Sequence, residues 1–353
     1  MRTRHNRQTL GWFGSPYTAR ESLEWLRGYL SPRVRDLGTL IPLSRRRSGR
    51  GSRVARLVFL GDIMPPPNGR PPTVSPAIRS VLRSSDVVIG NLESTIGKDG
   101  SRGNRFGIHE QTLARVLEAF DVEPTQCCLS VANNHIADFG AAGISTTIEA
   151  LQRLGVTPVG YMTPDGPADV RWSLGDVCVG LVAWTEWINR PPPDHPLTIM
   201  RSEDADRRFH DVMPDVDLTI AFPHWGYEFR HDPDPTQRAT ATALAARSID
   251  LIVGHHAHVI QPAESIGGTL CFHGLGGFIQ SRSVALRWPV RLGMLLVVDL
   301  CREAGDPPTI AYDIVPVVHE HRRDDHRLVC LSEASRADRR RMIPRFERLF
   351  PDP

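Results

Sequence analysis

The chain has 353 residues, of which 41% are hydrophobic and 23% charged, so it can bury a substantial core. Its 42 basic and 40 acidic residues nearly balance, which argues against a general polyanion binder, and no nucleic-acid partner is expected. The sequence contains no apolar run long enough to span a bilayer, and its first residues lack the apolar core of a secretory signal. Neither a transmembrane segment nor a signal peptide is therefore expected.

The six cysteines show no CxxC spacing, and most lie in apolar runs typical of strands. We interpret them as buried, reduced thiols, which favours a cytoplasmic location. The adjacent Cys127 and Cys128 could form a redox pair, but packing in the core is the favoured interpretation. A peripheral position at the inner face of the membrane is a second possibility, because the N-terminal region is basic.

Residues 1–53 are predicted to be a basic extension that is partly flexible. Within it, Thr18–Leu30 places Leu23 and Trp25 at roughly helical spacing, which predicts a short helix. The run Ser44–Ser52 is rich in Arg and Gly and predicts a linker. A solvated tail is favoured over contact with nucleic acid or acidic lipid, because no aromatic ladder accompanies the arginines.

Residues 54–320 alternate strand-like and helical runs, which indicates one large α/β domain, and residues 321–353 predict a basic C-terminal helix or tail. The loop Thr185–His195 is long enough to be a lid or a substrate wall. The main predicted strands and helices are, in order, Arg56–Leu60, Ser75–Arg83, Asp86–Gly90, Gln111–Phe120, Cys127–Ala132, Ala142–Leu154, Val177–Trp184, Asp204–Val212, Asp217–Phe222, Thr236–Arg247, a strand that begins at Asp250, Met294–Leu300 and Thr309–Val318.

Polar side chains follow five of the predicted strands. They are Asp62, then Asn91 and Glu93, then Asn134 and His135, then His224, and finally His256 and His258. Open α/β sheets place their sites at the carboxyl ends of strands, so we expect these side chains to converge. One histidine at a strand end is most often structural, whereas this repetition favours a metal site, and neutral imidazole suits zinc, iron, nickel or copper.

Five motifs carry a resemblance to a known family: Gly61-Asp62, Asn91-Leu-Glu93, Ala132-Asn-Asn-His135, His224-Trp-Gly-x-Glu228 and Gly254-His-His-x-His-Val259. Between about Arg56 and Val298 the chain resembles the bacterial CapA family, which is linked to capsule and poly-γ-glutamate synthesis. The resemblance implies a metallophosphoesterase-like α/β fold, a four-layer α-β-β-α sandwich of mixed sheets.

The resemblance also implies a cofactor of one or two divalent ions, manganese, iron or zinc. The implied ligands are Asp62, Glu93, Asn134, His224, His256 and His258. In metallophosphoesterases a metal-activated hydroxide attacks the substrate. By this resemblance His135 would protonate the leaving group or stabilise its charge, and Asn134 beside it would be the second catalytic residue.

Two positions depart from the metallophosphoesterase pattern. Met64 stands where such enzymes have a histidine, and Asn91 stands where they have a bridging aspartate. Glu93 could supply the missing charge, and the site could hold one tight metal rather than two. His255 is expected to point away from the centre, because side chains alternate in an extended segment.

Further residues are expected around the ligands, either orienting them or touching the substrate: Asn91, Arg105, Glu186, Asn189, Glu228 and Glu264. Glu228 and Glu264 could accept hydrogen bonds from metal-bound histidines, or be surface charges. Arg105 suits an anionic phosphate or carboxylate.

The sequence thus favours a CapA-like metal-dependent hydrolase or transferase in capsule, poly-γ-glutamate or other envelope polymer metabolism. Its partners would be an anionic small molecule or polymer and other capsule-synthesis proteins. The alternative is a non-catalytic accessory subunit of a polymer synthesis or export complex.

Overall fold

The computed structural model describes residues 18–31, 33–34, 40–45, 51–97, 101, 105–164, 166–190, 198–199, 215–281, 287–303, 305–322 and 325–351. The helix predicted at Asp204–Val212 lies outside these residues. So do most of the linker predicted at Ser44–Ser52 and the second half of the loop Thr185–His195.

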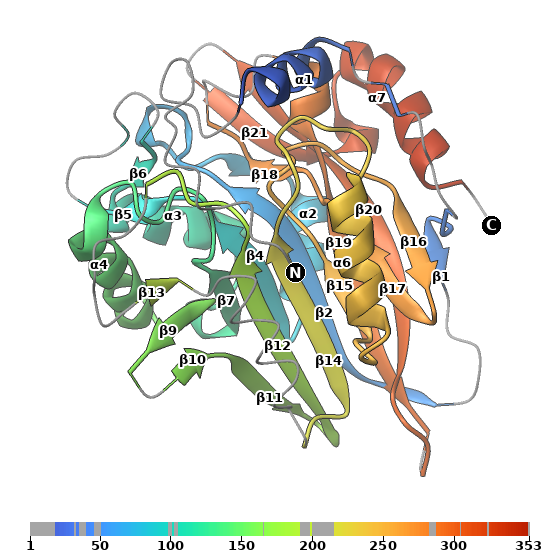
Figure 1. Cartoon of the computed structure of the whole chain (residues 1–353). Coiled ribbons are helices and arrows are strands. Elements are labelled where there is room, and N and C mark those ends of the chain that lie inside the picture. The colour runs from blue at the N-terminus through green and yellow to red at the C-terminus, as the bar shows by residue number, and fades with distance from the viewer. Residues whose placement is uncertain are drawn as a thin grey trace.

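The larger of two central sheets has ten strands (Figure 1). Its main order is β3-β21-β20-β19-β2-β4-β7-β8, with β1 paired to β20 and β18 paired to β2. The strands are β1 (Ser44–Arg45), β2 (Ser52–Ile63), β3 (Thr73–Val74), β4 (Val87–Leu92), β7 (Cys127–Ser130), β8 (Thr157–Val159), β18 (Gly277–Ile279), β19 (Leu292–Arg302), β20 (Thr309–Arg322) and β21 (Asp325–Cys330). Strands β2, β4, β7 and β8 run parallel, so their carboxyl ends lie at one edge.

The second sheet has six strands in the order β11-β12-β14-β15-β17-β16. They are β11 (Val170–Leu174), β12 (Val177–Thr185), β14 (Leu218–His224), β15 (Leu251–Val253), β16 (Ala263–Ile266) and β17 (Thr269–Phe272). Strands β12, β14, β15 and β17 are parallel. Short strands β5 (Thr95–Ile96) and β6 (Gly107–Ile108) form a pair, and β9 (Tyr161–Thr163), β10 (Gly166–Ala168) and β13 (Thr198–Ile199) form a small third sheet.

The layering follows from the alternation of side chains along the central strands. In β2, Leu57 and Phe59 enter the core between the two sheets, whereas Val58 and Leu60 enter the core on the opposite face. That opposite face is covered by α2 (Pro76–Arg83), α3 (Glu110–Phe120) and α4 (Gly140–Arg153). The outer face of the second sheet is covered by α6 (Pro235–Ala245).

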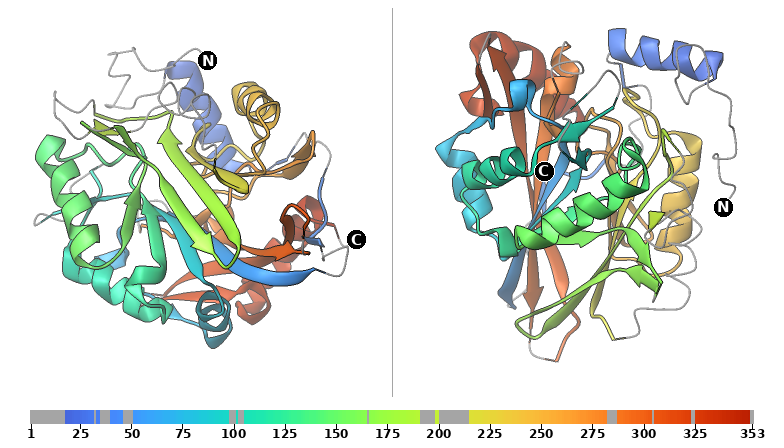
Figure 2. Two further views of the ribbon diagram at one scale, coloured as in Figure 1. Left: turned by 90° about the horizontal axis from the view of Figure 1, so that it is seen from below. Right: turned by 90° about the vertical axis from the view of Figure 1, so that its left-hand side faces the viewer.

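The right-hand view of Figure 2 shows these layers edge-on, with α6 on one side and α2 and α3 on the other. The four-layer α-β-β-α sandwich of mixed sheets predicted from the sequence is therefore confirmed.

Two further helices lie at the top of Figure 1, one from each end of the chain. The predicted N-terminal helix is α1 (Ala19–Leu30), whose cap residue Thr18 forms a capping box with Glu21. The predicted C-terminal helix is α7 (Arg336–Leu349), which packs Met342 and Phe346 into the core between the sheets. Among the described helices, none combines the length and the apolar character that crossing a bilayer requires.

Strand β2 is longer than the predicted Arg56–Leu60, because it continues through Gly61 and Asp62 to Ile63. Gly61 permits this, since a Cβ there would clash with the carbonyl oxygen of Gly276. The close approach lets β18 pair with the end of β2, and Asp62 pairs with Asn91 of β4 after a shift in register between Phe59 and Asp62.

The core between the sheets should carry most of the stability. Leu57 is fully buried there, whereas Leu23 on α1 is 48% exposed. We expect Leu57→Ala to lower the free energy of unfolding by about 2–5 kcal/mol, through lost burial and a residual cavity. Leu23→Ala is the matched control and should change it by less than about 0.5 kcal/mol. Urea denaturation measures both, and equal effects would contradict the assignment of this core.

Candidate metal centre

The parallel strands of both sheets deliver their polar ends to one place. Asp62 and Asn91 are paired at the ends of β2 and β4, and His224, the last residue of β14, forms a bridge with His255. Two loops complete the cluster, one after β7 with Asn134 and one after β15 with residues 255–258. Residues from across the sequence therefore meet where the carboxyl edges of the two sheets adjoin, as predicted.

Asp62 is the anion at the centre of this cluster, and it is completely buried. Its Oδ1 accepts a hydrogen bond from Asn91 Nδ2 at 2.8 Å. Its Oδ2 lies 3.1 Å from His258 Nδ1 and accepts the His256 backbone N–H at 3.2 Å. One carboxylate thus ties β2 to β4 and to the histidine-bearing loop.

His224 lies between the two halves of the cluster. Its Nε2 is 2.9 Å from Asn134 Oδ1 and 3.9 Å from Glu93 Oε1, while its Nδ1 is 2.7 Å from His255 Nδ1. Glu93 Oε1 in turn lies 3.6 Å from His258 Nε2. All six ligands predicted from the resemblance are therefore brought together.

Several ligand atoms have no hydrogen-bond partner within the described part of the chain. These are both carboxylate oxygens of Glu93 and both ring nitrogens of His256, and both side chains are buried. The candidate ligands form three sets of three residues, and within each set the ligand atoms lie within 4.8 Å of one another. The sets are Asp62 with His224 and His255, Glu93 with His224 and His256, and Asp62 with Glu93 and His258. A buried carboxylate without a partner is costly, and mixed nitrogen and oxygen donors suit a divalent cation such as zinc, iron or manganese. The residues present therefore fit a divalent metal.

Burial and charge set the protonation of the cluster. Burial raises the pKa of Asp62, but the hydrogen bond and charge of His258 outweigh it and leave that pKa below its ordinary value. Burial and the Asp62 charge hold the pKa of Glu93 well above 4.5. Burial also holds the pKa values of His224 and His256 well below 6.5. The imidazoles of His224 and His256 are therefore neutral at physiological pH, which is the form that binds metals.

The expectation that His255 points away from the centre is wrong. Its Nδ1 lies 2.7 Å from His224 Nδ1 and 3.6 Å from Asp62 Oδ1. Burial lowers the pKa of His255 to about 4, partly offset by the negative charge of Asp62. The alternation rule failed because β15 ends at Val253, and His256 adopts a left-handed conformation with φ 93°.

His135 lies at the edge of the cluster and is held by two neighbours. Its Nδ1 is 2.7 Å from Asp138 Oδ2, and its ring stacks on Phe106 with centroids 3.9 Å apart. The Phe106 backbone N–H donates to the same Asp138 oxygen at 2.8 Å. Because the Nδ1 side is engaged by a carboxylate, Nε2 is the nitrogen left for contact with a substrate.

The two departures from the metallophosphoesterase pattern have clear structural roles. Asn133 Nδ2 donates to Asn91 Oδ1 at 3.2 Å, so Asn91 turns its amide nitrogen, and not its oxygen, toward Asp62. Met64 is buried, and its sulfur accepts the Ser281 backbone N–H at 3.4 Å. Neither residue offers an oxygen or nitrogen ligand in the direction of the cluster.

The two glutamates expected to orient the histidines have other partners. Glu228 Oε2 accepts a hydrogen bond from Trp25 Nε1 at 2.8 Å. Glu264 Oε1 lies 2.6 Å from His273 Nε2 and 2.7 Å from Arg238 Nη1. These partners are not candidate ligands, and sequence spacing alone gave no means of seeing them.

The three predicted substrate contacts are connected to the cluster in different ways. The Asn189 backbone N–H donates to the Asn134 carbonyl oxygen at 2.9 Å, and the Glu186 backbone N–H donates to the His224 carbonyl oxygen at 3.0 Å. Arg105 is half-buried and directly precedes Phe106. The first two therefore adjoin ligands through the backbone, and Arg105 adjoins the residue that stacks on His135.

Comparison with known proteins agrees with this arrangement. Residues 56–282, more than half of the chain, match the family model described as bacterial capsule synthesis protein PGA_cap. The chain belongs to this family. The CapA resemblance that its motifs suggested is therefore confirmed.

Two relatives of this PGA_cap protein carry CapA names. It is 30% identical over 219 residues to the PGA biosynthesis protein CapA of Bacillus subtilis, which covers 57% of this chain and 55% of the relative. It is 28% identical over 260 residues to the capsule biosynthesis protein CapA of Bacillus anthracis, covering 67% of this chain and 59% of the relative. The matches thus span less than two thirds of either relative.

A solved structure supports the fold. A candidate 5'-nucleotidase of Staphylococcus aureus, solved in complex with alpha-ketoglutarate, superimposes with a TM-score of 0.50 and 13% identity, over 83% of this chain and 58% of that one. At this identity the likeness concerns the fold alone.

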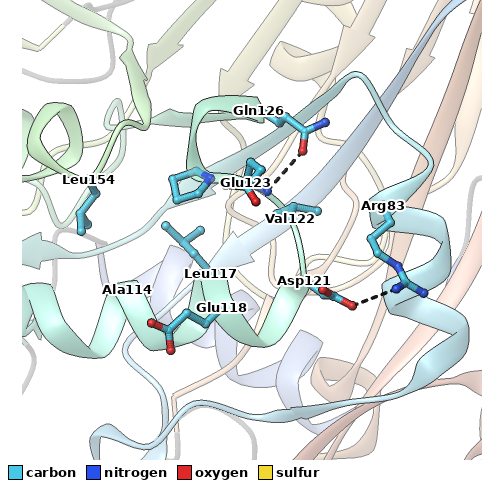
Figure 3. A pocket seen from close by; sticks show the side chains of 10 residues that line it. Arg83, Ala114, Leu117, Glu118, Asp121, Val122, Glu123, Gln126 and Leu154 are labelled. Atoms are coloured by element: carbon cyan, nitrogen blue, oxygen red, sulfur yellow. Dashed lines mark hydrogen bonds and ion pairs between the residues drawn. The ribbon is translucent and has the colours of Figure 1, made fainter.

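A separate groove of about 690 Å³ lies near the amino ends of β4 and β7 in this PGA_cap protein. Figure 3 shows the side chains that line it. It is lined by the ends of α2 and α3 and by the residues before β7, and Arg83 pairs there with Asp121 at 3.3 Å. It contains none of the clustered ligands. The candidate site is therefore the buried cluster and not this groove.

The raised pKa of Glu93 predicts opposite effects of Glu93→Gln with and without metal. Since the folded state keeps this proton above the ordinary pKa of 4.5, the free energy of unfolding of the metal-free protein falls as pH rises from there toward the raised pKa. In EDTA at neutral pH we therefore expect Glu93→Gln to be more stable than the wild type. In Mn²⁺ the order should reverse, because the variant lacks an anionic ligand.

Urea unfolding between about pH 5 and about pH 8, with EDTA or Mn²⁺, measures this effect. Glu264→Gln is the control, since its carboxylate lies outside the cluster, and Mn²⁺ should stabilise it as much as the wild type. A Glu93→Gln variant that Mn²⁺ stabilises as much as the wild type would contradict the ligand role.

Proposed function

We propose that this PGA_cap protein is a metal-dependent hydrolase or transferase that acts on an anionic substrate in capsule or other envelope polymer metabolism. One observation carries the proposal: Glu93 and His256 are buried beside Asp62, and their side-chain ligand atoms have no hydrogen-bond partner within the described residues. A purely structural cluster would have these atoms paired. A cation-binding cluster needs them free.

The proposed ligands are the six predicted residues, Asp62, Glu93, Asn134, His224, His256 and His258. A divalent ion held there would polarise a phosphoryl or carbonyl oxygen and lower the pKa of water. Manganese, iron and zinc all suit the donor set. Burial of the ligands keeps bulk water away from the charged groups, which strengthens their interactions with substrate.

His135 is the proposed proton donor to the leaving group. Asp138 and Phe106 fix its ring, so that Nε2 faces any substrate bound at the cluster. Asn134, the neighbouring residue, is proposed to hold the metal through Oδ1 and so to place the substrate next to His135. Arg105 is proposed to bind an anionic group of the substrate, because guanidinium suits phosphate and carboxylate.

The substrate class rests on family membership. Both CapA relatives are named for capsule or PGA biosynthesis, so an anionic polymer or its precursor is the proposed substrate, and capsule-synthesis proteins are the proposed partners. Because these names speak of biosynthesis and not of hydrolysis, a non-catalytic accessory subunit is the second candidate. The cytoplasmic location stays a prediction from the six cysteines, which form no disulfide among the described residues.

Activity with a generic phosphomonoester, phosphodiester or amide substrate and Mn²⁺ tests the proposal. We expect His256→Ala to lose metal and activity together. His135→Ala should keep the metal and lose about 10²–10⁴-fold in kcat, the usual contribution of a general acid. His109→Ala is the control, because His109 is an exposed residue before α3. Stoichiometric metal without turnover on any of these substrates would favour the accessory subunit.

We also propose that His255 orients His224. The 2.7 Å contact between their Nδ1 atoms leaves His224 Nε2 facing Asn134, and the Phe222 ring packs against that of His255 with centroids 4.5 Å apart. Replacing such an orienting group typically weakens metal affinity about 10–100-fold. His255→Phe should therefore raise the Kd for Mn²⁺ in calorimetric titration. His273→Phe is the matched control, since His273 is also buried but pairs with Glu264.

A further inference from the structure

Two loops next to the candidate metal centre carry an unusual backbone conformation. Phe229, His256 and His258 have φ values of 58°, 93° and 55°, in the left-handed region that residues other than glycine rarely adopt. Such conformations persist only where the surroundings fix them. Neighbouring groups must therefore hold these two loops in place.

The loops hold each other through Phe229. Its backbone N–H donates to the Ala257 carbonyl oxygen at 2.8 Å, midway between the two histidines. Its ring lies 5.8 Å from the ring of His258, centroid to centroid. The position of Phe229 thus bears directly on the positions of His256 and His258.

Helix α1 covers Phe229 from the outside. The ring of Trp25 meets that of Phe229 edge-on at 4.9 Å, and Tyr29 lies at 5.0 Å from it. Trp25 also packs against the aromatic cluster of Trp187 and Tyr227, and the Trp187 ring is 6.0 Å from that of His256. One indole therefore packs against aromatic groups that adjoin both proposed ligands.

Polar contacts fix the helix on these loops. Trp25 Nε1 donates to Glu228 Oε2 at 2.8 Å, and the Tyr227 hydroxyl donates to Glu21 Oε1 at 2.9 Å. Glu24 forms an ion pair with Arg230. The residues on each side of Phe229 are thus bound to α1.

Gly28 permits the close approach. A Cβ at this position would clash with the Phe229 carbonyl oxygen, and the Gly28 carbonyl oxygen accepts a hydrogen bond from His231 Nε2 at 3.1 Å. Any side chain at position 28 would therefore push α1 away from the Phe229 loop.

Helix α1 lies outside residues 56–282, the range that matches the family model, and its described residues take no part in the cores that involve the two sheets. We propose that α1 is a positioning element of the metal centre. Through Trp25 and Gly28 it presses Phe229 against the His256–His258 loop and keeps both histidines in their ligand positions. The inference rests on the metal-binding part of the proposed function.

Titration of the full-length protein with Mn²⁺ tests the inference. Trp25→Ala should raise the Kd about 10-fold or more, the usual effect of losing a group that orients ligands. Gly28→Ala should do the same by displacing the helix. Trp25→Phe keeps a ring against Phe229 and should stay near the wild type. Leu26→Ala, on the outer side of α1 where Leu26 is 43% exposed, is the matched control and should bind normally.

Hydrogen exchange in EDTA tests the same inference without metal. Amides of the segment from Val253 to Ile260 should exchange faster in Trp25→Ala and Gly28→Ala than in Leu26→Ala. Unchanged exchange together with unchanged Mn²⁺ affinity would overturn the role of α1. If the wild type binds no Mn²⁺, the proposed function fails, and the exchange measurement alone decides whether α1 positions the loop.

Discussion

The structure depends on a buried cluster of charge that needs a positive partner. Asp62 and Glu93 are completely enclosed at the junction of the two sheets, and His258 lies 3.1 Å from Asp62 and 3.6 Å from Glu93. Placing two carboxylates there without a cation is unfavourable, so one of them keeps its proton and its pKa rises. A divalent ion would replace that proton and connect ligands from both sheets. The same arrangement would serve the proposed metal chemistry and would couple folding to metal binding.

Much of this arrangement could be predicted from the sequence because it follows from strand geometry. Buried strands are recognised in a sequence as apolar runs, and parallel strands have their carboxyl ends at one edge of the sheet. These two rules alone predicted that Asp62, Asn134 and His224 would converge. The order of the motifs then indicated the CapA family, which the family model confirms. Helical spacing of apolar residues also located α1, and α7 was predicted as a basic C-terminal helix.

Other features were beyond sequence reasoning because they depend on contacts between distant segments. The direction of His255 was missed, since alternation along a strand does not apply after Val253, where the backbone turns. From their positions in the motifs, Glu264 and Glu228 were expected to orient metal-binding histidines. In the structure their hydrogen-bond partners are His273 and Trp25. Phe106 directly precedes the short strand β6, and no local pattern predicted that its ring would stack on His135.

The departures at positions 64 and 91 bear on how many ions the cluster holds. A metallophosphoesterase with two metals uses a carboxylate at the bridging position, whereas here Asn91 donates its amide hydrogen to Asp62. That hydrogen bond engages one oxygen of Asp62, and only Asp62 and Glu93 supply negative charge among the proposed ligands. Two carboxylates neutralise one divalent ion, but a second ion would leave an excess of positive charge in a site closed to solvent. Charge balance therefore favours the proposal of a single ion, with Asp62, Glu93 and His258 as the donor group that contains both carboxylates.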